Sequence, residues 1–396
     1  MNLKETVQNL ADKIFPEILE IRRFIHQHPE LSFHEYKTAE YICEVLGKEN
    51  IAYRKGIAGT GILADIEGCE SGRIVGLRAD MDALPIQEEN TVDYRSVNDG
   101  KMHACGHDVH TACLIGAARI LNELRDQFPG KVKLVFQPAE EMAPGGARLL
   151  LEENLFGNEK PDLMIAQHVY PAMYTGRVGF KAGKYMASSD EIYITVRGKG
   201  GHAAMPHQIT DSVLIASHIL VALQQIVSRH AVASTPTVLS IGKMMANGAV
   251  NVIPSEVIME GTFRTMDENW RKEAHSRMIN MAKSIAESMG AICEFKIVEG
   301  YPVLHNDPGI TSKSIDFARM YLGKEYVEDL DIRMTAEDFA FFAQVFPSVL
   351  YRLGVRKSEQ AQPLDLHTPF FNIDEEAIRT GTGMLAWLAL SHLNGD

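Results

Sequence analysis

The chain has 396 residues, of which 45% are apolar, and its 39 Lys and Arg against 52 Asp and Glu give a formal charge of −13. This acidic balance excludes a partner that is bound mainly through neutralised phosphates, so neither nucleic acid nor an anionic membrane surface is expected. The sequence shows no run of about 18 apolar residues and no signal-peptide pattern. We therefore expect a soluble cytoplasmic protein of about two or three domains that has no membrane partner.

The first part of the chain alternates helical and strand-like patterns. Apolar residues at helical spacing predict helices at about 5–27, 35–49 and 110–124. Apolar, partly β-branched runs predict strands at 61–66, 73–79, 132–136 and 163–167. Strands that alternate with helices are typical of an α/β domain with a mostly parallel sheet and helices on both faces. Ligands of such sheets bind beyond the carboxyl ends of the strands, where the motifs HACGHD, QPAEE and AQHVY lie.

The pattern changes between about residues 187 and 300. Six elements are expected there, in the order strand 190–196, helix 211–229, strand 237–245, strand 256–264, helix 268–289 and strand 292–298. Thr210 or Asp211 is the expected N-cap of the first of these helices. This β-α-β-β-α-β order is the ferredoxin-like arrangement, with two helices on one face of an antiparallel sheet.

The α/β pattern resumes after residue 301. A strand is expected at 349–353 and a closing helix at about 374–392. We therefore expect an α/β domain in two parts, 1–186 and 301–396, with an α+β domain inserted at 187–300.

The segment HACGHDVH concentrates three histidines, a cysteine and an aspartate. If it is extended, Cys105 and His107 face the same side, because residues two apart in a strand do so. Two functions are then open. Cys105 could be a nucleophile that His107 activates, or both could bind a zinc-like ion. The five cysteines are odd in number and widely scattered, which argues against a disulfide framework.

A second motif distinguishes these two functions. Glu140 and Glu141 follow the apolar run VKLVF, and adjacent carboxylates in a partly dry cleft repel each other unless cations neutralise them. Beside a metal, one carboxylate can bind the ion while its neighbour takes a proton from water. His168 also follows an apolar strand, and His367 lies in a loop. A thiol protease has no use for the paired glutamates, whereas a dinuclear metal site uses all of these residues.

Several motifs occur in one order along almost the whole chain: RRFIHQHPELSFHE, GLRADMDALPIQE, HACGHDVHTA, QPAEE, GKGGHAAMPH, NVIPS, GTFR and TAEDFAFF. Together they resemble the amidohydrolase branch of the aminoacylase/carboxypeptidase metallopeptidases, which includes hippurate hydrolases, indole-acetyl-amino-acid hydrolases and N-acetyldiaminopimelate deacetylases. The resemblance implies two divalent metal ions per subunit, Mn²⁺ or Zn²⁺, with Co²⁺ and Ni²⁺ as alternatives. It also implies metal ligation by Cys105, His107, Glu141, His168 and His367.

The resemblance also implies roles around these ligands. Glu140 would be the general base. Cys105 would bridge the ions, with His107 and His168 on one and Glu141 and His367 on the other. Asp80 and Asp108 would hydrogen-bond to the imidazoles and orient them. Most other branches take their first ligand from a His-x-Asp motif, where this chain has Arg78-Ala79-Asp80. This departure argues against ligation through that strand, and Cys105 with His107 would compensate.

In this family the inserted domain is a lid that mediates dimerisation. The resemblance implies a homodimer or higher homo-oligomer in which His202 polarises the scissile carbonyl at the partner's site, while Asn251 and Arg264 hold the substrate carboxylate. From the residues alone, His202 could equally be a solvated side chain after a glycine turn, and Arg264 a surface charge. Glu337 and Asp338 are expected at a helix N-terminus that Thr335 caps.

The predicted function is metal-dependent hydrolysis of small N-acyl amino acids of acetyl, benzoyl or indole-acetyl type, which releases a carboxylic acid and a free amino acid. Three alternatives stay open. They are a dipeptidase or carboxypeptidase of the same superfamily, a catalytically silent metal-binding or scaffold protein, and a thiol enzyme that uses Cys105.

Overall fold

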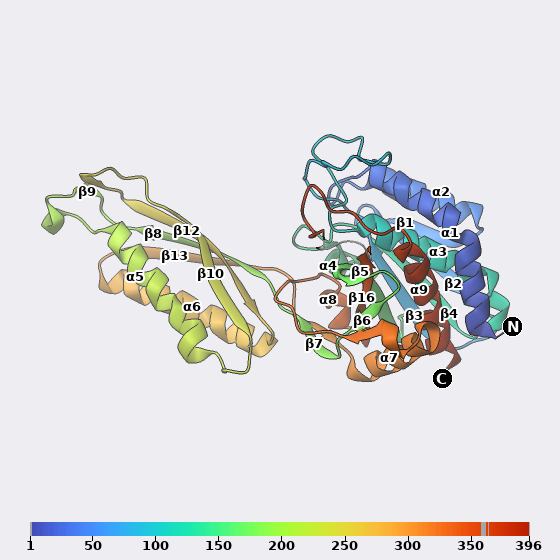
Figure 1. Cartoon of the computed structure of the whole chain (residues 1–396). Coiled ribbons are helices and arrows are strands. Elements are labelled where there is room, and N and C mark those ends of the chain that lie inside the picture. Colours follow the sequence, from blue (N-terminus) through green and yellow to red (C-terminus); the bar gives the residue numbers. More distant parts are fainter. Residues whose placement is uncertain (1, 358–361, 363, 396) are drawn as a thin grey trace. The chain divides into compact units, whose positions relative to one another are not determined.

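The computed structural model describes residues 2–357, 362 and 364–395. The chain forms two compact units, which are considered separately. The first unit comprises Met1–Gly183, His305–Asp331 and Asp338–Asp396, and the second comprises Lys184–Leu304 and Ile332–Glu337. Figure 1 labels the elements of both.

The first unit is built on a mixed eight-stranded sheet. Its strands are β1 (Ala52–Ile57), β2 (Gly61–Glu67), β3 (Ile74–Asp80), β4 (Lys131–Gln137), β5 (Leu163–Tyr174), β6 (Val178–Phe180), β15 (Val327–Asp329) and β16 (Ser348–Arg356). Their order is β1-β2-β4-β3-β5-β16-β6-β15. The central strands β4, β3, β5 and β16 run parallel, whereas β1, β2 and β4 pair antiparallel, as do β16 and β6. The predicted α/β class with a mostly parallel sheet is confirmed.

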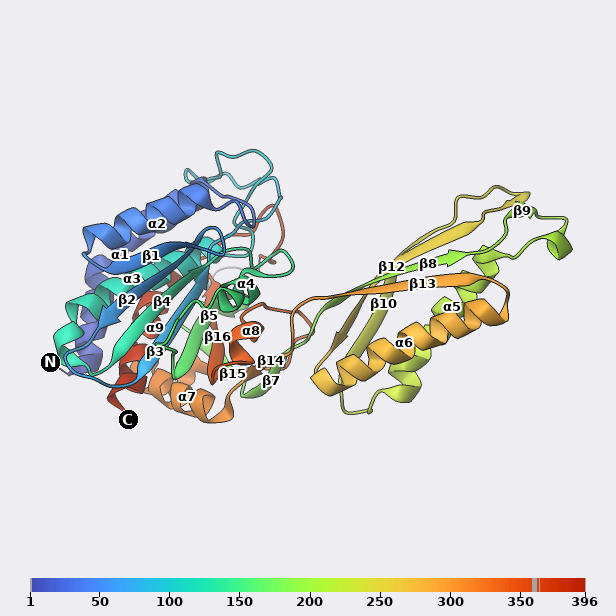
Figure 2. The same cartoon turned by 180° about the vertical axis from the view of Figure 1, so that it is seen from behind.

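Helices cover both faces of this sheet. They are α1 (Leu3–Gln27), α2 (Tyr36–Lys48), α3 (His107–Glu123), α4 (Gly146–Glu152), α7 (Pro308–Leu322), α8 (Ala340–Ala343) and α9 (Ala377–Asn394). Val75, Leu77 and Ala79 of β3 point into the apolar core that α1, α3 and α9 complete. The alternate β3 residue Arg78 points to the opposite face, where α4 and α8 lie (Figure 2). The period-2 alternation of β3 thus separates an apolar face from a face that carries buried charge.

The second unit has the predicted β-α-β-β-α-β order. Its main elements are β8 (Asp190–Arg197), α5 (Ser212–Gln225), β10 (Thr237–Met245), β12 (Glu256–Thr265), α6 (Glu268–Ser288) and β13 (Ile292–Glu299). The sheet order is β10-β12-β8-β13, and every pairing is antiparallel. Ile192, Ile194 and Val196 are fully buried and form one core with residues of α5 and α6. Asp211 caps α5 through the backbone N–H groups of Val213 and Leu214.

One helix among the described residues, Ser212–His230, is long and apolar enough to cross a membrane by length and composition alone. It consists of α5 and the short π-helical turn Ile226–His230. Its inward side chains Ile215, Ile219 and Leu223 belong to the core of the second unit. Amphipathic packing against a sheet therefore accounts for its apolar character.

Two sequence-based expectations need correction. The prediction missed β1, because this edge strand is almost entirely exposed and its residues AYRKGI show no apolar alternation. The predicted helix cap at Thr335 is wrong. The short helix α8 begins only at Ala340, and Phe339 occupies its N-cap position. The Asp338 carboxylate instead bonds to Arg78 and Gln137, so tertiary ion pairing takes the place of capping.

Candidate metal centre

The predicted ligands of the first unit come from four separate segments. Cys105 and His107 lie at the start of α3, Glu141 follows β4, His168 lies on β5, and His367 lies in the loop after β16. Two groups of ligand atoms share Cys105: Cys105, His107 and His168 form one, and Cys105, Glu141 and His367 form the other. Within each group the atoms lie within 4.8 Å of one another. The structure thus brings together all five predicted ligands.

The start of α3 is not the extended segment that the sequence analysis assumed. Gly106 is in the left-handed region with φ 82° and is the N-cap of the helix. A Cβ at this position would lie 2.6 Å from Val169 Cγ2, so both backbone conformation and space require glycine. Cys105 and His107 therefore meet in one donor group because the chain turns at Gly106 into the helix, and not because they alternate along a strand.

Hydrogen bonds orient two of the predicted imidazole ligands. His168 Nδ1 donates to the Val169 carbonyl oxygen at 2.8 Å, which leaves Nε2 as the acceptor nitrogen, 3.6 Å from Cys105 Sγ. His107 Nδ1 donates to Asp82, with 2.9 Å to the carbonyl oxygen and 3.1 Å to Oδ1. Each ring therefore presents Nε2 toward the centre, in the manner of metal-binding histidines.

His367 reaches the centre from a loop. Its backbone N–H donates to the Ala104 carbonyl oxygen at 2.9 Å, which ties the loop to the segment that carries Cys105. The backbone is left-handed at His367, with φ 60°, an uncommon conformation for a residue other than glycine. His367 Nε2 lies 3.3 Å from Glu141 Oε1.

Asp80 and Asp108 lie close to the centre but bond to other histidines. Asp80 Oδ1 accepts from His110 Nδ1 at 2.6 Å, and His110 Nε2 accepts from the Val169 N–H at 2.9 Å. Both nitrogens of His110 are therefore engaged within the protein. Asp108 Oδ2 lies 2.8 Å from His26 Nδ1 and accepts from Arg22 Nε, also at 2.8 Å. The predicted ligand His107 donates its hydrogen bond to Asp82 instead. Asp82 was not predicted, although it lies in the quoted motif GLRADMDALPIQE.

The donor set fits divalent metal ions. His107 Nε2 and Glu141 Oε1 are buried and have no hydrogen-bond partner among the described residues. Burial and the nearby Glu141 hold the pKa of the Cys105 thiol well above its usual value. For His107, burial acts against the charged form, but Asp80 and the hydrogen bond to Asp82 outweigh it and raise the pKa well above its usual value. The site therefore retains protons, which metal ions displace when they bind thiolate and imidazole.

The same charges bear on the alternative in which Cys105 is a nucleophile. Reactive thiols have a lowered pKa, usually next to a cationic group. Here burial and Glu141 raise the pKa of Cys105. This direction is opposite to the one that activates a thiol nucleophile.

Glu140 stands beside the predicted ligands. Its side chain is buried, and its carboxylate forms a third group of donor atoms with His107 and Glu141. Its Oε1 accepts a long hydrogen bond of 3.4 Å from the Asp338 N–H. A buried carboxylate at this place is suited to move protons next to a bound ion.

The predicted residues of the second unit lie in two places, His202 and Asn251 at a short ribbon and Arg264 near the far end of β12. His202 lies on β9 (Gly201–His202), which pairs with β11 (Val252–Ile253), and the Ala203 N–H donates to the Asn251 carbonyl oxygen at 3.0 Å. The structure thus brings His202 and Asn251 together at this short ribbon. Arg264 is half-buried on β12 and donates to the Met334 carbonyl oxygen. Burial lowers the pKa of its guanidinium group.

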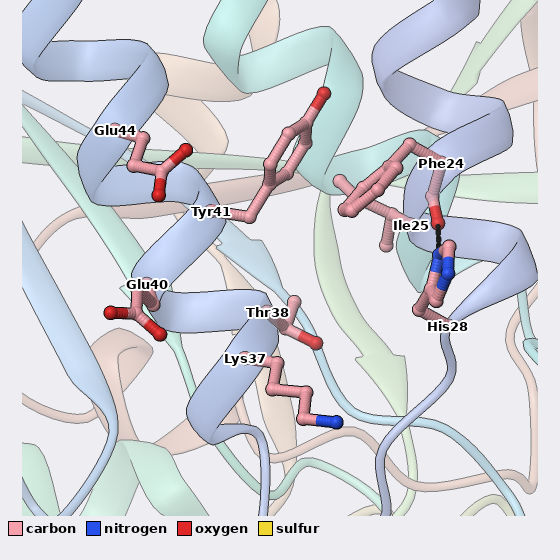
Figure 3. A pocket seen from close by; sticks show the side chains of 8 residues that line it. All are labelled: Phe24, Ile25, His28, Lys37, Thr38, Glu40, Tyr41 and Glu44. Carbon is pink, nitrogen blue, oxygen red and sulfur yellow. Dashed lines mark hydrogen bonds between the residues drawn. The ribbon is translucent and has the colours of Figure 1, made fainter.

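A groove of about 210 Å³ lies between α1 and α2 (Figure 3). Phe24 and Tyr41 line it, with ring centroids 4.1 Å apart and ring planes tilted by 31°, and His28 Nδ1 donates to the Phe24 carbonyl oxygen. None of the predicted site residues lines this groove. It therefore does not belong to the metal centre.

A family model described as peptidase family M20/M25/M40 matches residues 76–391. The chain belongs to this peptidase family. The matched residues include most of the first unit and the whole of the second unit. The predicted resemblance to these metallopeptidases and the prediction of a hydrolase that acts on carbon–nitrogen bonds are confirmed.

Individual relatives cover most or all of this M20 chain. An N-acyl-L-amino acid amidohydrolase of Geobacillus stearothermophilus is 42% identical over 307 residues, which are 77% of this chain and 82% of the relative. Thermostable carboxypeptidase 2 of Saccharolobus solfataricus is 35% identical over 397 residues, 100% of both chains. The crystal structure of the Bacillus subtilis YXEP protein, described as a dinuclear metal binding peptidase from the M20 family, is 34% identical with a TM-score of 0.82 and covers 96% of this chain and 99% of that chain.

Arg78 begins the stretch Arg78-Ala79-Asp80, which lies on β3. It is fully buried and donates to Asp80 Oδ2 at 2.6 Å, to Asp338 Oδ1 at 2.7 Å and to Gln137 Oε1 at 2.8 Å. Together with His110, Arg78 engages both oxygens of Asp80. On this strand Arg78 therefore forms an internal network of ion pairs with Asp80 and Asp338.

Arg78→Ala is expected to destabilise the first unit by about 3–5 kcal/mol, because it leaves Asp80 and Asp338 buried with less compensating charge. The thermal unfolding midpoint of that unit should fall by about 10 °C, measured by differential scanning calorimetry. Arg148→Ala is the matched control, since it removes only an exposed pair with Glu152 and should shift the midpoint by about 1 °C or less. Equal shifts in the two variants would contradict a structural role for Arg78.

Proposed function

We propose that this chain hydrolyses the amide bond of small N-acyl amino acids to a carboxylic acid and a free amino acid. Two divalent ions would be held by Cys105, His107, Glu141, His168 and His367, with Cys105 shared. The observation that carries this proposal is the pair of donor groups that have Cys105 in common, with the buried Glu140 carboxylate next to them. A protein that only binds metal or serves as a scaffold has no need of such a carboxylate, which argues against a catalytically silent role.

Metal ions bound at this centre supply Lewis acidity, which makes water a better nucleophile and polarises a carbonyl oxygen. Glu140 would take the proton of the attacking water and deliver it to the leaving nitrogen. His202 would donate a hydrogen bond to the carbonyl oxygen as negative charge develops there. Asn251 and Arg264 would bind the carboxylate of the amino-acid part, for which a guanidinium fork has matching geometry.

Assembly and metal identity are further parts of the proposal. A homodimer formed through the second unit would bring His202 to the partner's centre. The thiolate of Cys105 favours Zn²⁺, while the imidazole and carboxylate ligands also accept Mn²⁺, Co²⁺ or Ni²⁺. The acidic chain would act in the cytoplasm, where thiols stay reduced.

Hydrolysis of peptides is the second candidate function. The same centre could cleave a dipeptide or a C-terminal residue, and the similarity to thermostable carboxypeptidase 2 along the whole chain favours this candidate. Both reactions attack an amide carbonyl next to an amino acid with a free carboxylate. They differ in the group on the acyl side, which is apolar and uncharged in an N-acyl amino acid and carries an ammonium group in a dipeptide.

Dialysis against a chelator is expected to abolish hydrolysis, and add-back of Zn²⁺, Mn²⁺, Co²⁺ or Ni²⁺ is expected to restore it, because the donor groups need their ions for activity. A panel of N-acetyl-, N-benzoyl- and indole-acetyl-amino acids should be cleaved with at least about tenfold higher kcat/KM than dipeptides. Faster cleavage of dipeptides would favour the peptidase. Activity that survives chelation but is lost on alkylation would identify a thiol enzyme instead.

A further inference from the structure

The backbone N–H groups of three successive residues, Ala139, Glu140 and Glu141, all donate to buried carboxylates. The Ala139 N–H donates to Glu35 Oε1 at 2.8 Å. The N–H groups of Glu140 and Glu141 donate to Asp82 Oδ1 and Oδ2 at 3.1 and 3.0 Å. Both acceptors lie far away in sequence, Glu35 before α2 and Asp82 just after β3.

The turn that these carboxylates hold is strained. Ala139 has φ 49°, a left-handed conformation that is uncommon for a residue with a Cβ. Such a conformation persists only where the surroundings over-determine it. Here the Ala139 N–H is bound by Glu35, and its carbonyl oxygen accepts from the Gly146 N–H at 2.9 Å. The turn directly follows β4 and sets the directions in which the Glu140 and Glu141 side chains leave the backbone.

The two carboxylates are themselves fixed by other donors. Asp82 also accepts from the Ser32 hydroxyl at 2.6 Å and from His107 Nδ1 at 3.1 Å. Asp82 therefore joins the His107 ring to the backbone of both glutamates. Glu35 also accepts from the Phe33 N–H at 3.0 Å and from the Thr60 hydroxyl at 2.7 Å. Both side chains are almost completely buried.

We propose that Glu35 and Asp82 are positioning residues that clamp the Ala139–Glu141 turn and thereby set the base Glu140, the ligand Glu141 and the ligand His107 relative to one another. This proposal rests on the proposed function for the roles of those three residues. Neither Glu35 nor Asp82 is a metal ligand or touches substrate in it. The two acids act through hydrogen bonds to the backbone and to one imidazole.

The acceptor geometry predicts that the two acids differ in their tolerance of an amide. The N–H groups of Phe33 and Ala139 both donate to Glu35 Oε1. Among the described residues, Oε2 accepts a hydrogen bond from the Thr60 hydroxyl alone, and a hydroxyl can accept as well as donate. A glutamine can therefore keep every bond at this position. Burial and the nearby Asp82 also raise the pKa of Glu35 to about 7, so an uncharged side chain resembles its own protonated form.

An amide cannot replace the Asp82 carboxylate in the same way. Each of its oxygens receives a backbone N–H, from Glu140 on one side and Glu141 on the other. An asparagine must therefore turn its NH₂ group toward one of these N–H donors, and it loses that hydrogen bond in either orientation. Asp82→Asn should disturb the turn although it preserves the shape of the side chain.

Four variants of the full-length protein test the clamp: Asp82→Asn, Glu35→Ala, Glu35→Gln and the control Asp162→Asn. Asp162 also accepts a backbone N–H, from Ile74 at the start of β3, the end of the strand away from the centre. Hydrogen exchange of the amides at positions 139–141 is followed by mass spectrometry with fragmentation. Zn²⁺ and Mn²⁺ affinities are measured by titration of the chelator-treated protein, and kcat is measured on an N-acyl amino acid.

Asp82→Asn and Glu35→Ala are expected to speed amide exchange at positions 139–141 by about tenfold or more, whereas Glu35→Gln and Asp162→Asn should leave it within about twofold. Asp82→Asn should also weaken metal binding by about 10–100-fold, the usual effect of losing a group that orients a ligand. Glu35→Ala should lower kcat more than metal affinity. If the Glu35→Ala variant does not fold, the comparison of the near-isosteric variants Asp82→Asn and Glu35→Gln still tests the clamp.

Wild-type exchange and metal affinity in Asp82→Asn would overturn the clamp, as would a Glu35→Gln variant that behaves like Asp82→Asn. These readouts are independent of the reaction. If the wild type cleaves no N-acyl amino acid but the exchange and affinity changes occur as expected, the clamp stands and the proposed function fails. If the wild type is active and Asp82→Asn leaves exchange and affinity unchanged, the function stands and the clamp fails.

Discussion

A Glu140→Ala enzyme is expected to bind its metal ions as the wild type does and to hydrolyse N-acyl amino acids about 10²–10⁴-fold more slowly, the usual contribution of a general base. The backbone N–H of residue 140 stays bound to Asp82 in this variant, so the turn keeps its course. The five ligand side chains of the two groups that share Cys105 are untouched. Metal content by plasma mass spectrometry and kcat on the same preparation measure the two effects separately.

Glu141→Ala is the matched control for this prediction. It removes a carboxylate of the same size from the adjacent position, and it should lower metal content together with activity, because Glu141 belongs to one of the two groups. Near-normal activity of Glu140→Ala would show that another group is the base. Loss of metal from both variants would show that Glu140 is itself a metal ligand. Its position in a donor group with His107 and Glu141 is compatible with that role.

Cys105→Ala is expected to weaken the binding of both metal ions by at least about 100-fold and to lower activity in parallel, because both donor groups lose their shared member. Each of the two donor groups would then keep only two of its three donors. Titration calorimetry of the chelator-treated protein gives the two affinities, and activity is measured at saturating Zn²⁺ or Mn²⁺.

Cys113→Ala provides the control for loss of a buried thiol. Cys113 lies on α3, the helix that begins at the predicted ligand His107. It is fully buried and donates weakly to the Ile378 carbonyl oxygen at 3.7 Å. Its pKa is raised to about 12 by burial, so it stays a neutral packing residue. This variant should lose stability but retain both metal affinities. A fully metallated, active Cys105→Ala enzyme would exclude the shared-ligand arrangement.

Local sequence patterns predicted many of the elements that bury a face in the core, although the helix α7 was not among them. The apolar run of β5 and the helical spacing of α1 are visible in the sequence because each element buries a face in the core. The short two-residue strands β9 and β11 and the exposed edge strand β1 were not predicted, because elements that bury little leave no periodic signal. Their place depends on pairing with distant segments.

The sequence by itself determined the residue types of the centre: a thiol, imidazoles and a pair of adjacent carboxylates, grouped in motifs that follow strands. Only the tertiary structure decided which polar groups support them. Glu35 meets the Ala139 N–H across 104 positions, and Arg78 meets Asp338 across 260. No local pattern encodes such pairs, since their partners meet only when separate strands and loops pack together and must then satisfy one another's buried hydrogen-bonding groups and charges.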